Sequence, residues 1–494
     1  MDDNTLKTRS IKFNFIMNAI LTVSQVLFPL ITFPYISRVL RVEGSGVVAF
    51  ATSVITYFTM FATLGVPTYG IRACARVRDD REKLSQTVQE LLIISGITTI
   101  ITYAVFFAML FFVPKFAAQK ELLMVVGVSI GLTTIGVQWF YNALEQYSYI
   151  TVCSIVFKLV GLVLMVLFVK NPEDYIVYGV IYVVGNFGAY VLNFLRLRKF
   201  ITFRKQGSYA LKEHFRGTML FFLLSAATSV YLNLDIVMLG FMKNDTEVGY
   251  YNAAIKVKNV LVTGVTSLGT VLLPRLSYYV QKKEKAEFQR TIAKAFEFVL
   301  LIATSVMVYF MIYAEESILL LAGKDFLPAV VSMVILMPTV LLIGLSNITG
   351  MQILTPQGEE TKVVYSVAAG AVLDFVFNLL LIPKYGAAGA AVSTLMAEFL
   401  VILVQSFYLR EELGGILKKI QFWKIGLGLA LASVSAVLLQ IYVHTREFTE
   451  LLVSAVIFFG IFFLTLVLVK EKFVREFWDM GWNFVRNRGR RGEI

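Results

Sequence analysis

The sequence predicts an all-α polytopic membrane protein with about fourteen transmembrane helices. Of its 494 residues, 57% are hydrophobic and 16% are charged, whereas about a quarter of the residues in a soluble domain are charged. Apolar runs long enough to cross a bilayer, about 20 residues each, follow one another along the chain. In addition, 32 of the 45 Lys and Arg residues lie at or near the segment ends on the side of the N-terminus, and 9 lie on the other side. Because cytoplasmic loops carry the excess of Lys and Arg, we expect both termini in the cytoplasm.

The first apolar run is expected to remain in the mature protein as a transmembrane helix. It begins near Phe13, after a polar N-terminus, and continues to about Ile36, which is longer than the apolar region of a signal peptide. The expected transmembrane segments, with no soluble domain between them, are 13–36, 47–71, 88–113, 121–144, 149–169, 176–195, 217–241, 249–275, 292–314, 328–353, 362–382, 387–409, 423–443 and 450–469.

A weak internal repeat predicts two related halves. Adding 204 to Thr52, Thr59 and Thr63 reaches Lys256, Thr263 and Ser267, so the polar stripes of segments 47–71 and 249–275 coincide. We therefore expect two pseudo-symmetric six-helix bundles, residues 1–200 and 201–415, followed by two further helices and a basic tail in residues 416–494. Transporters commonly place the substrate site between such repeats.

Segment 249–275 carries a polar face at bilayer depth. Asn252, Lys256, Asn259 and Thr263 share this face at helical periodicity. A cation in a membrane span is by default a hypothesis of a functional site. Lys256 is therefore a candidate substrate contact, the alternative being an ion pair with Asp235.

Other segments carry polar residues that would line the same space. A structural role in helix packing stays open for the hydroxyl and aromatic members of this set. The candidates are Asn18 and Gln25 in 13–36, Thr59 in 47–71, Lys158 in 149–169, and Tyr182 and Asn186 in 176–195.

Arginines and acids near or within the spans complete the set of candidates. Arg38, Arg72 and Arg275 lie at span ends, where they either contact a diphosphate or extend to lipid head groups. The in-span acids Asp374, Glu398 and Asp235 are candidates for binding a coupling proton or sodium ion, or for neutralising the lysines.

The motifs of enzymatic and metal sites are missing from the sequence. It has no G-x-x-x-x-G-K-[ST] phosphate loop, no G-x-S-x-G elbow and no H-E-x-x-H. Two cysteines and two histidines without clustered carboxylates give little basis for a disulfide framework or a metal site. The formal charge of +12 lies in loops, where it sets orientation. We expect a protein that is not an enzyme, needs no cofactor and binds no nucleic acid.

Five strings, met in this order along nearly the whole chain, resemble the polysaccharide-repeat-unit flippases. These form the polysaccharide-transport family of the multidrug/oligosaccharidyl-lipid/polysaccharide exporter superfamily. The strings are F-P-Y-I-S-R-V-L from Phe33, F-A-T-L-G-V-P-T-Y-G-I-R ending at Arg72, W-F-Y-N-A-L-E-Q-Y-S-Y-I-T from Trp139, F-V-K-N-P-E-D-Y from Phe168, and Y-Y-N-A-A-I-K-V-K-N with L-L-P-R-L-S in segment 249–275.

The resemblance implies transport of an undecaprenyl-diphosphate-linked oligosaccharide across a bacterial plasma membrane. We expect alternating access by rocking of the two halves. The diphosphate would meet Lys256, Lys158, Arg38, Arg72 and Arg275. Membrane lipids and other polysaccharide-assembly proteins are the other expected partners. Two alternatives stay open, a cation-coupled multidrug exporter of the same superfamily and a membrane-embedded glycan polymerase.

Overall fold

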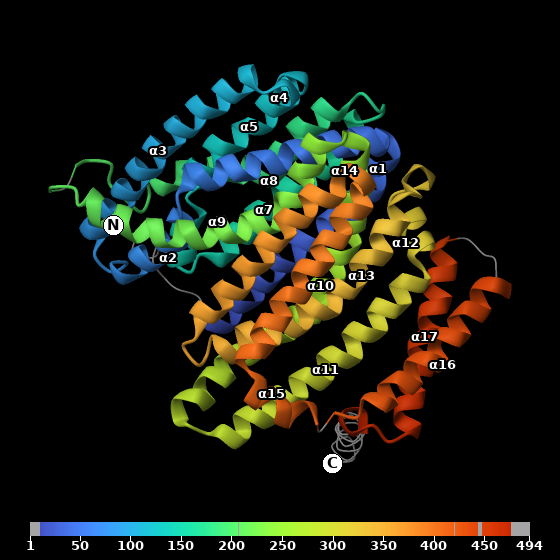
Figure 1. Ribbon diagram of the computed structural model, residues 1–494. Helices are drawn as coiled ribbons and strands as arrows, with labels where there is room; N and C mark the ends of the chain where they lie inside the picture. Colours follow the sequence, from blue (N-terminus) through green and yellow to red (C-terminus); the bar gives the residue numbers. More distant parts are fainter. Residues whose placement is uncertain (1–9, 206, 419, 443–446, 476–494) are drawn as a thin grey trace, which may run out of the picture. The chain divides into compact units, whose positions relative to one another are not determined.

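The computed structural model describes residues 10–205, 207–418, 420–442 and 447–475, and every regular element within them is helical (Figure 1). Ten of the described helices are long and apolar enough to cross a membrane, and two bent helices also qualify if each is taken as one span. The helical runs Lys12–Arg76 and Glu360–Tyr408 contain 65 and 49 residues, enough for two crossings each at about 20 residues per crossing. The predicted fold class is confirmed, and these lengths accommodate fourteen crossings.

The chain forms two compact units, Met1–Asn252 and Ala253–Ile494. The first contains α1 Ile11–Thr63, α2 Val66–Arg76, α3 Arg81–Phe112, α4 Pro114–Ala118, α5 Lys120–Ile135, α6 Gln138–Ala143, α7 Tyr147–Phe168, α8 Tyr175–Leu197 and α9 Leu211–Met242. Helix α10, Asp245–Lys282, begins in the first unit and ends in the second. The second unit continues with α11 Lys285–Ile312, α12 Ala314–Leu321, η1 Lys324–Phe326, α13 Ala329–Asn347, η2 Ile348–Leu354, α14 Glu360–Tyr408, α15 Arg410–Leu417, α16 Phe422–Tyr442 and α17 Glu447–Leu468.

Two sequence-based expectations about the whole chain stay predictions. One is the division into repeats at residues 200 and 415. The other is the cytoplasmic location of both ends, which lie in residues 1–9 and 476–494, outside the described part of the chain.

In place of the loop expected between residues 36 and 47, α1 has a kink that joins two helices. Its one non-helical residue is Arg41, with φ 57° and ψ −168°. After the kink, Gly46 packs closely on another segment, because a Cβ atom there would lie 1.7 Å from the carbonyl oxygen of Asp245. The acidic and glycine-rich stretch is therefore a site of backbone contact between α1 and the start of α10.

Residues with positive φ break the helices at three further places. Leu64 (φ 44°) and Gly65 (φ 73°) end α1 before α2 begins, and Val137 (φ 37°) divides the expected segment 121–144 into α5 and α6. Gly386 (φ 54°) is the break within α14, which joins the expected segments 362–382 and 387–409. Leucine and valine rarely adopt this conformation, so propensity alone does not predict two of these breaks.

Each unit has its own hydrophobic core. In the first unit, Trp139, Phe140 and Tyr141 of α6 pack with α2 and α3, and the hydroxyl of Tyr141 donates to the Asn193 carbonyl at 2.6 Å. In the second unit, α16 and α17 pack on α11 and α12, where the hydroxyl of Tyr309 donates to the Leu451 carbonyl at 2.6 Å. Both aromatic side chains are buried along their rings and satisfied at their polar ends.

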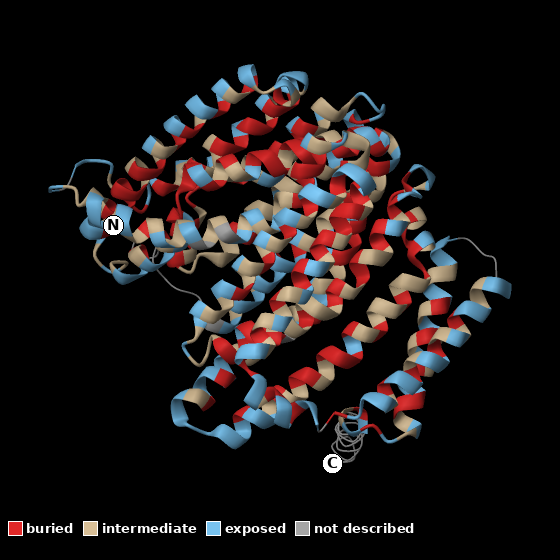
Figure 2. Cartoon of the chain, in the orientation of Figure 1, coloured by how far each residue is buried: buried red, intermediate tan, exposed pale blue. Residues whose placement is uncertain are grey.

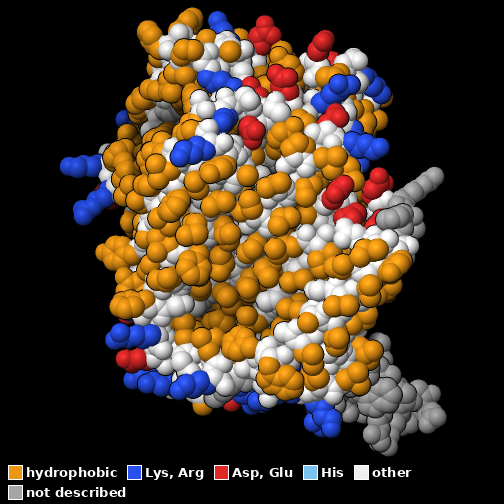
Figure 3. Space-filling view, turned by 45° about the vertical axis from the view of Figure 1, so that its right-hand side comes forward, with side chains coloured by type: hydrophobic (Ala, Val, Ile, Leu, Met, Phe, Trp, Pro, Cys, Tyr) orange, Lys and Arg blue, Asp and Glu red, His pale blue; other side chains and the backbone are white. Residues whose placement is uncertain are grey.

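Helix faces turned away from these cores are apolar. Figure 2 shows buried and exposed residues alternating along the helices, and Figure 3 shows a broad hydrophobic surface with charged side chains gathered toward its edges. Phe112, Phe111 and Ile100 of α3 are among the exposed apolar residues. This distribution is expected of a protein whose surface faces lipid hydrocarbon.

Helix α3 begins with a side-chain cap outside the membrane span. Asp80 accepts hydrogen bonds from the backbone N–H groups of Lys83 and Glu82, each at 3.1 Å. The bond from the Lys83 N–H is the main cause that lowers the pKa of the Asp80 carboxyl. The cap fixes the start of α3. This helix also holds the connection between α8 and α9.

The connection between α8 and α9, described for residues 198–205 and 207–210, is held on the buried face of α3. Gln89 Nε2 donates to the Arg204 carbonyl at 3.1 Å, and Glu90 Oε1 accepts from the Ala210 N–H at 2.8 Å. The other carboxylate oxygen of Glu90 lies 2.8 Å from His214 Nε2. The start of α9 is therefore positioned by α3.

Replacement of Glu90 by alanine should lower the thermal melting temperature of the purified protein. It would leave the half-buried Ala210 N–H and His214 without their carboxylate partner, at up to about 1–3 kcal/mol for each unsatisfied group. The matched control is Glu82→Ala, which removes an exposed carboxylate from the same helix. Equal melting temperatures for the two variants would show that Glu90 does not hold this connection.

Candidate functional site

A pocket of about 350 Å³ lies within the first unit and is rich in hydroxyl groups. Five helices contribute to it, and nine of its fifteen lining residues carry a hydroxyl. We call it the hydroxyl-lined pocket. The nine are Thr52, Thr56, Thr59 and Thr63 of α1, Ser129 and Thr133 of α5, Tyr182 of α8, and Ser225 and Ser229 of α9.

Most of these hydroxyls donate their proton to their own helix. Thr56 Oγ1 donates to the Thr52 carbonyl at 2.8 Å, and Thr63 Oγ1 donates to the Thr59 carbonyl at 2.9 Å. Thr133 Oγ1 donates to the Ser129 carbonyl at 2.7 Å. Since a hydroxyl has one donor and two acceptor lone pairs, each oxygen can still accept a hydrogen bond. The pocket wall therefore presents acceptors, which suits a ligand rich in O–H groups.

Sequence periodicity identified one wall of this pocket and missed two others. Thr59 and Tyr182 are predicted site residues that the structure brings together here. The serine and threonine pairs of α5 and α9 were not singled out, although each pair has the spacing of one helical turn. The hydroxyl residues four positions apart that identified the α1 stripe also occur in α5 and α9, but as one pair in each helix.

The other candidates of the first unit lie elsewhere on its helices. Asn18 and Gln25 are exposed on the first half of α1, and Arg72 is exposed on α2. Asn186 is also exposed, and its side chain donates to the Tyr182 carbonyl at 2.9 Å. None of these four is among the residues that line the hydroxyl-lined pocket.

Two cations of the first unit contact α1: Lys158 from α7, and Arg38 from α1 itself. Lys158 Nζ donates to Ser24 Oγ at 3.1 Å and lies 5.6 Å from the centroid of the Phe28 ring. Arg38 Nη1 donates to the Pro34 carbonyl at 2.7 Å, and Arg38 is exposed. Lys158 thus has neutral contacts on α1, which leave its charge without a counter-ion in these two interactions.

The polar face expected on α10 is present and largely uncovered. Asn259, Thr263 and Ser267 are exposed, while Val265 on another face is buried in the core of the second unit. Lys256 is half-buried on this face, as is Asn252 at the end of the first unit. An exposed polar stripe at bilayer depth requires water or protein rather than hydrocarbon beside it.

Arg275 and Asp235 have aromatic partners. Arg275 Nε donates to the Tyr279 hydroxyl at 2.7 Å on the same helix. Asp235 is buried in α9 and accepts a hydrogen bond from the Tyr251 hydroxyl of α10. The Tyr251 contact lies within the first unit, so it joins α9 to the start of α10.

The remaining two acids lie on opposite sides of the break in α14. Asp374 is 1% exposed and accepts from Asn378 Nδ2 at 3.2 Å, and Glu398 is 5% exposed. Gln405 Nε2 donates to Ser366 Oγ at 2.9 Å, so the two halves of α14 are also joined by a polar contact. Within the described residues, no group of three His, Cys, Asp or Glu side chains is placed to hold a metal ion.

Sequence comparisons find a family and several relatives. A family profile described as "Polysaccharide biosynthesis protein" matches residues 11–280. A "Putative O-antigen transporter" of Escherichia coli is 23% identical over 82% of this chain and 97% of its own length. The protein of the same name from Shigella dysenteriae is 25% identical over 79% of this chain and 98% of its own length.

Comparison with solved structures identifies the same fold. The structure described as "Lipid II flippase MurJ, inward closed conformation" has a TM-score of 0.76 at 13% identity, over 92% of this chain and 99% of that one. An inward-facing MATE transporter of the MOP superfamily has a TM-score of 0.62 at 14% identity, over 82% of this chain and 99% of that one. The predicted similarity to this superfamily in fold is confirmed.

We expect the hydroxyl-lined pocket to be wet, which cysteine labelling can measure. In a background with Cys74→Ala and Cys153→Ala, the variant Thr59→Cys should react with a membrane-impermeant thiosulfonate at least about tenfold faster than Phe61→Cys, because the thiolate is the reactive form and requires water. Phe61 is the matched control, since it lies on the same helix and is 52% exposed, but to hydrocarbon. Equal labelling rates for the two thiols would contradict a watery pocket.

Proposed function

The chain belongs to the polysaccharide biosynthesis protein family, and from this premise we propose that it is a flippase for lipid-linked oligosaccharides. It moves undecaprenyl-diphosphate-linked repeat units from the inner to the outer leaflet of a bacterial plasma membrane, by alternating access. The observation that carries the proposal is the hydroxyl-lined pocket within a membrane-spanning unit. Both termini are cytoplasmic in this proposal.

The pocket meets the main physical difficulty of moving a sugar through a membrane. A hydroxyl group without a partner in an apolar medium costs about 2–7 kcal/mol, and an oligosaccharide carries many. Thr56 and Thr63 have already donated their protons to α1, so they can accept from sugar hydroxyls without breaking an existing bond. The names of the O-antigen transporters that resemble this chain support a polysaccharide substrate.

The diphosphate requires cations, and α10 supplies one at bilayer depth. Lys256 lies on the polar face that also carries Asn259 and Thr263. Lys158, Arg38, Arg72 and Arg275 are further candidates, in falling order. Outward movement of each negative charge releases about 2.3 kcal/mol per 100 mV of inside-negative potential. The membrane potential therefore favours export of the substrate.

Removal of the Lys256 charge should slow transport. In proteoliposomes, we expect Lys256→Met to lower the initial rate at which a labelled lipid-linked oligosaccharide becomes accessible to an impermeant glycosidase by about tenfold or more. A charge-assisted hydrogen bond contributes about 1.5–3 kcal/mol, and 1.36 kcal/mol corresponds to tenfold in rate. Lys256→Arg should retain most of the rate.

The control for Lys256 is Lys282→Met, which removes an exposed charge at the end of the same helix. An unchanged rate in Lys256→Met would remove this lysine from the substrate site. A wild-type rate no higher than that of protein-free liposomes would overturn the flippase proposal itself.

We also propose that the buried acids couple transport to a cation gradient. Asp374 and Glu398 are buried in α14, and Asp235 in α9, where a carboxylate can bind sodium or a proton.

Asp374→Asn keeps the shape of the side chain and removes its charge. We expect the variant to lose acceleration by an imposed sodium or proton gradient while keeping transport without a gradient. The control Glu360→Gln changes an exposed acid on the same helix, and a gradient response equal in both variants would exclude Asp374 from coupling.

A further inference from the structure

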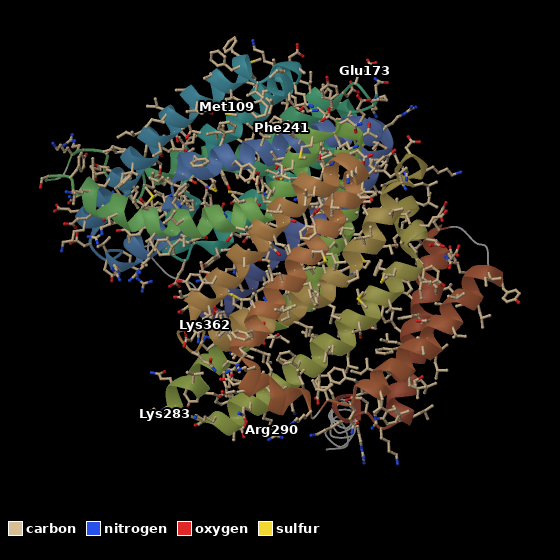
Figure 4. All side chains as sticks on the ribbon, viewed as in Figure 1. Met109, Glu173, Phe241, Lys283, Arg290 and Lys362 are labelled. Atoms are coloured by element: carbon tan, nitrogen blue, oxygen red, sulfur yellow. The ribbon has the colours of Figure 1, made fainter. Side chains whose placement is uncertain are left out.

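The first unit contains a second pocket, of about 450 Å³, whose chemistry is opposite to that of the first. It lies among α1, α3, α4 and α9, and five of its eleven lining residues are aromatic: Tyr57, Phe58, Phe61, Phe116 and Phe241. We call it the aromatic pocket. Figure 4 shows Met109 of α3 and Phe241 of α9, both of which line it, on neighbouring helices.

The same stretch of α1 forms a wall of both pockets. Residues 52, 56, 59 and 63 line the hydroxyl-lined pocket, whereas residues 54, 57, 58 and 61 line the aromatic pocket. At about 100° per residue, the two sets centre roughly 180° apart on the helix. This stretch therefore separates a polar compartment from an apolar one.

Helix α9 also contributes to both pockets and is tied to α1 between them. Ser225 and Ser229 line the hydroxyl-lined pocket, and Phe241 lines the aromatic pocket. The Tyr57 hydroxyl donates to the Val230 carbonyl at 3.4 Å. The contact lies between the serine pair and the distal phenylalanine along α9, so one pair of packed helices borders both spaces.

We propose that the aromatic pocket holds a segment of the substrate's prenyl chain while the hydroxyl-lined pocket holds its sugars. The inference rests on the proposed flippase function. A molecule with a hydroxyl-rich head and a hydrocarbon tail is the ligand class that fits both compartments at once. Apart from Tyr57 and Thr102, the residues that line the aromatic pocket have no polar side-chain group to hold water.

The rim of the aromatic pocket is open to a chain arriving from the bilayer. Phe61, Ile101 and Phe241 are 52%, 58% and 46% exposed, and all three line the pocket. Hydrophobicity alone gives no preference for the pocket over surrounding lipid tails, which are equally apolar. Selection must come from close packing, and flat aromatic walls pack differently against an unsaturated, methyl-branched prenyl chain than against a straight acyl chain.

Photolabelling of the full-length protein in phospholipid nanodiscs tests the proposal. The probe is a polyprenyl diphosphate with a diazirine near the end of its chain, and the labelled peptides are identified by mass spectrometry. We expect labelling of the residues that line the aromatic pocket, and displacement of the probe by unlabelled polyprenyl diphosphate. Ile101→Trp should reduce the labelling at least fivefold, because the indole occupies the pocket.

The matched control is Ile100→Trp, on the same helix and 71% exposed, but not among the lining residues. It should leave the labelling unchanged. Val105→Phe is a second variant that fills the pocket with a smaller change, and thermal melting of each variant shows that it is folded.

Two outcomes would overturn the proposal. One is labelling that falls outside the pocket or is unaffected by both filling variants. The other is equal labelling of the pocket by a diazirine-bearing phospholipid that polyprenyl diphosphate does not displace, since this identifies a general acyl-chain site. The readout needs no transport, so failure of the flippase assay with correct labelling would count against the proposed function alone.

Discussion

A polar group at bilayer depth must have a partner, and most of this structure can be understood from that constraint. An unsatisfied backbone or side-chain group in hydrocarbon costs several kcal/mol. The threonines of α1 meet the requirement locally, as when Thr52 Oγ1 donates to the Val48 carbonyl at 2.9 Å. A polar stripe satisfied within its own helix needs no permanent partner on another helix. The stripe can therefore face a pocket and exchange one ligand for another.

Several buried polar side chains meet the same constraint with partners on another helix or helix half. Glu90 of α3 contacts the start of α9, Asp235 of α9 contacts Tyr251 of α10, and the α14 pair of Gln405 and Ser366 crosses the break at Gly386. Each contact joins two helices or two helix halves. The polar interior therefore also determines how consecutive helices meet.

Sequence reasoning recovered the features that depend on local periodicity. The transmembrane segments, the threonine stripe of α1 and the polar face of α10 all follow from which residues are three or four positions apart. The breaks at Leu64 and Val137 did not follow, because these residue types seldom adopt positive φ. The pairing of Glu90 with His214 was also missed, since 124 positions separate them in the sequence. The division of α1 between a polar and an apolar pocket required knowledge of which helices pack on each side.

The differences between the polar stripes of α1 and α10, which the predicted repeat pairs with each other, match the two polar parts of the proposed substrate. Thr52 lies on the neutral stripe of α1, and the predicted repeat pairs it with Lys256 of α10, 204 positions further on. Neutral acceptors suit sugar hydroxyls, whereas a diphosphate requires a cation. A lysine in place of Thr52 would introduce a charge into a pocket whose described walls hold no acid among their lining residues. That charge would lack a counter-ion whenever the sugars are absent, so a neutral stripe in the first unit keeps the empty pocket stable.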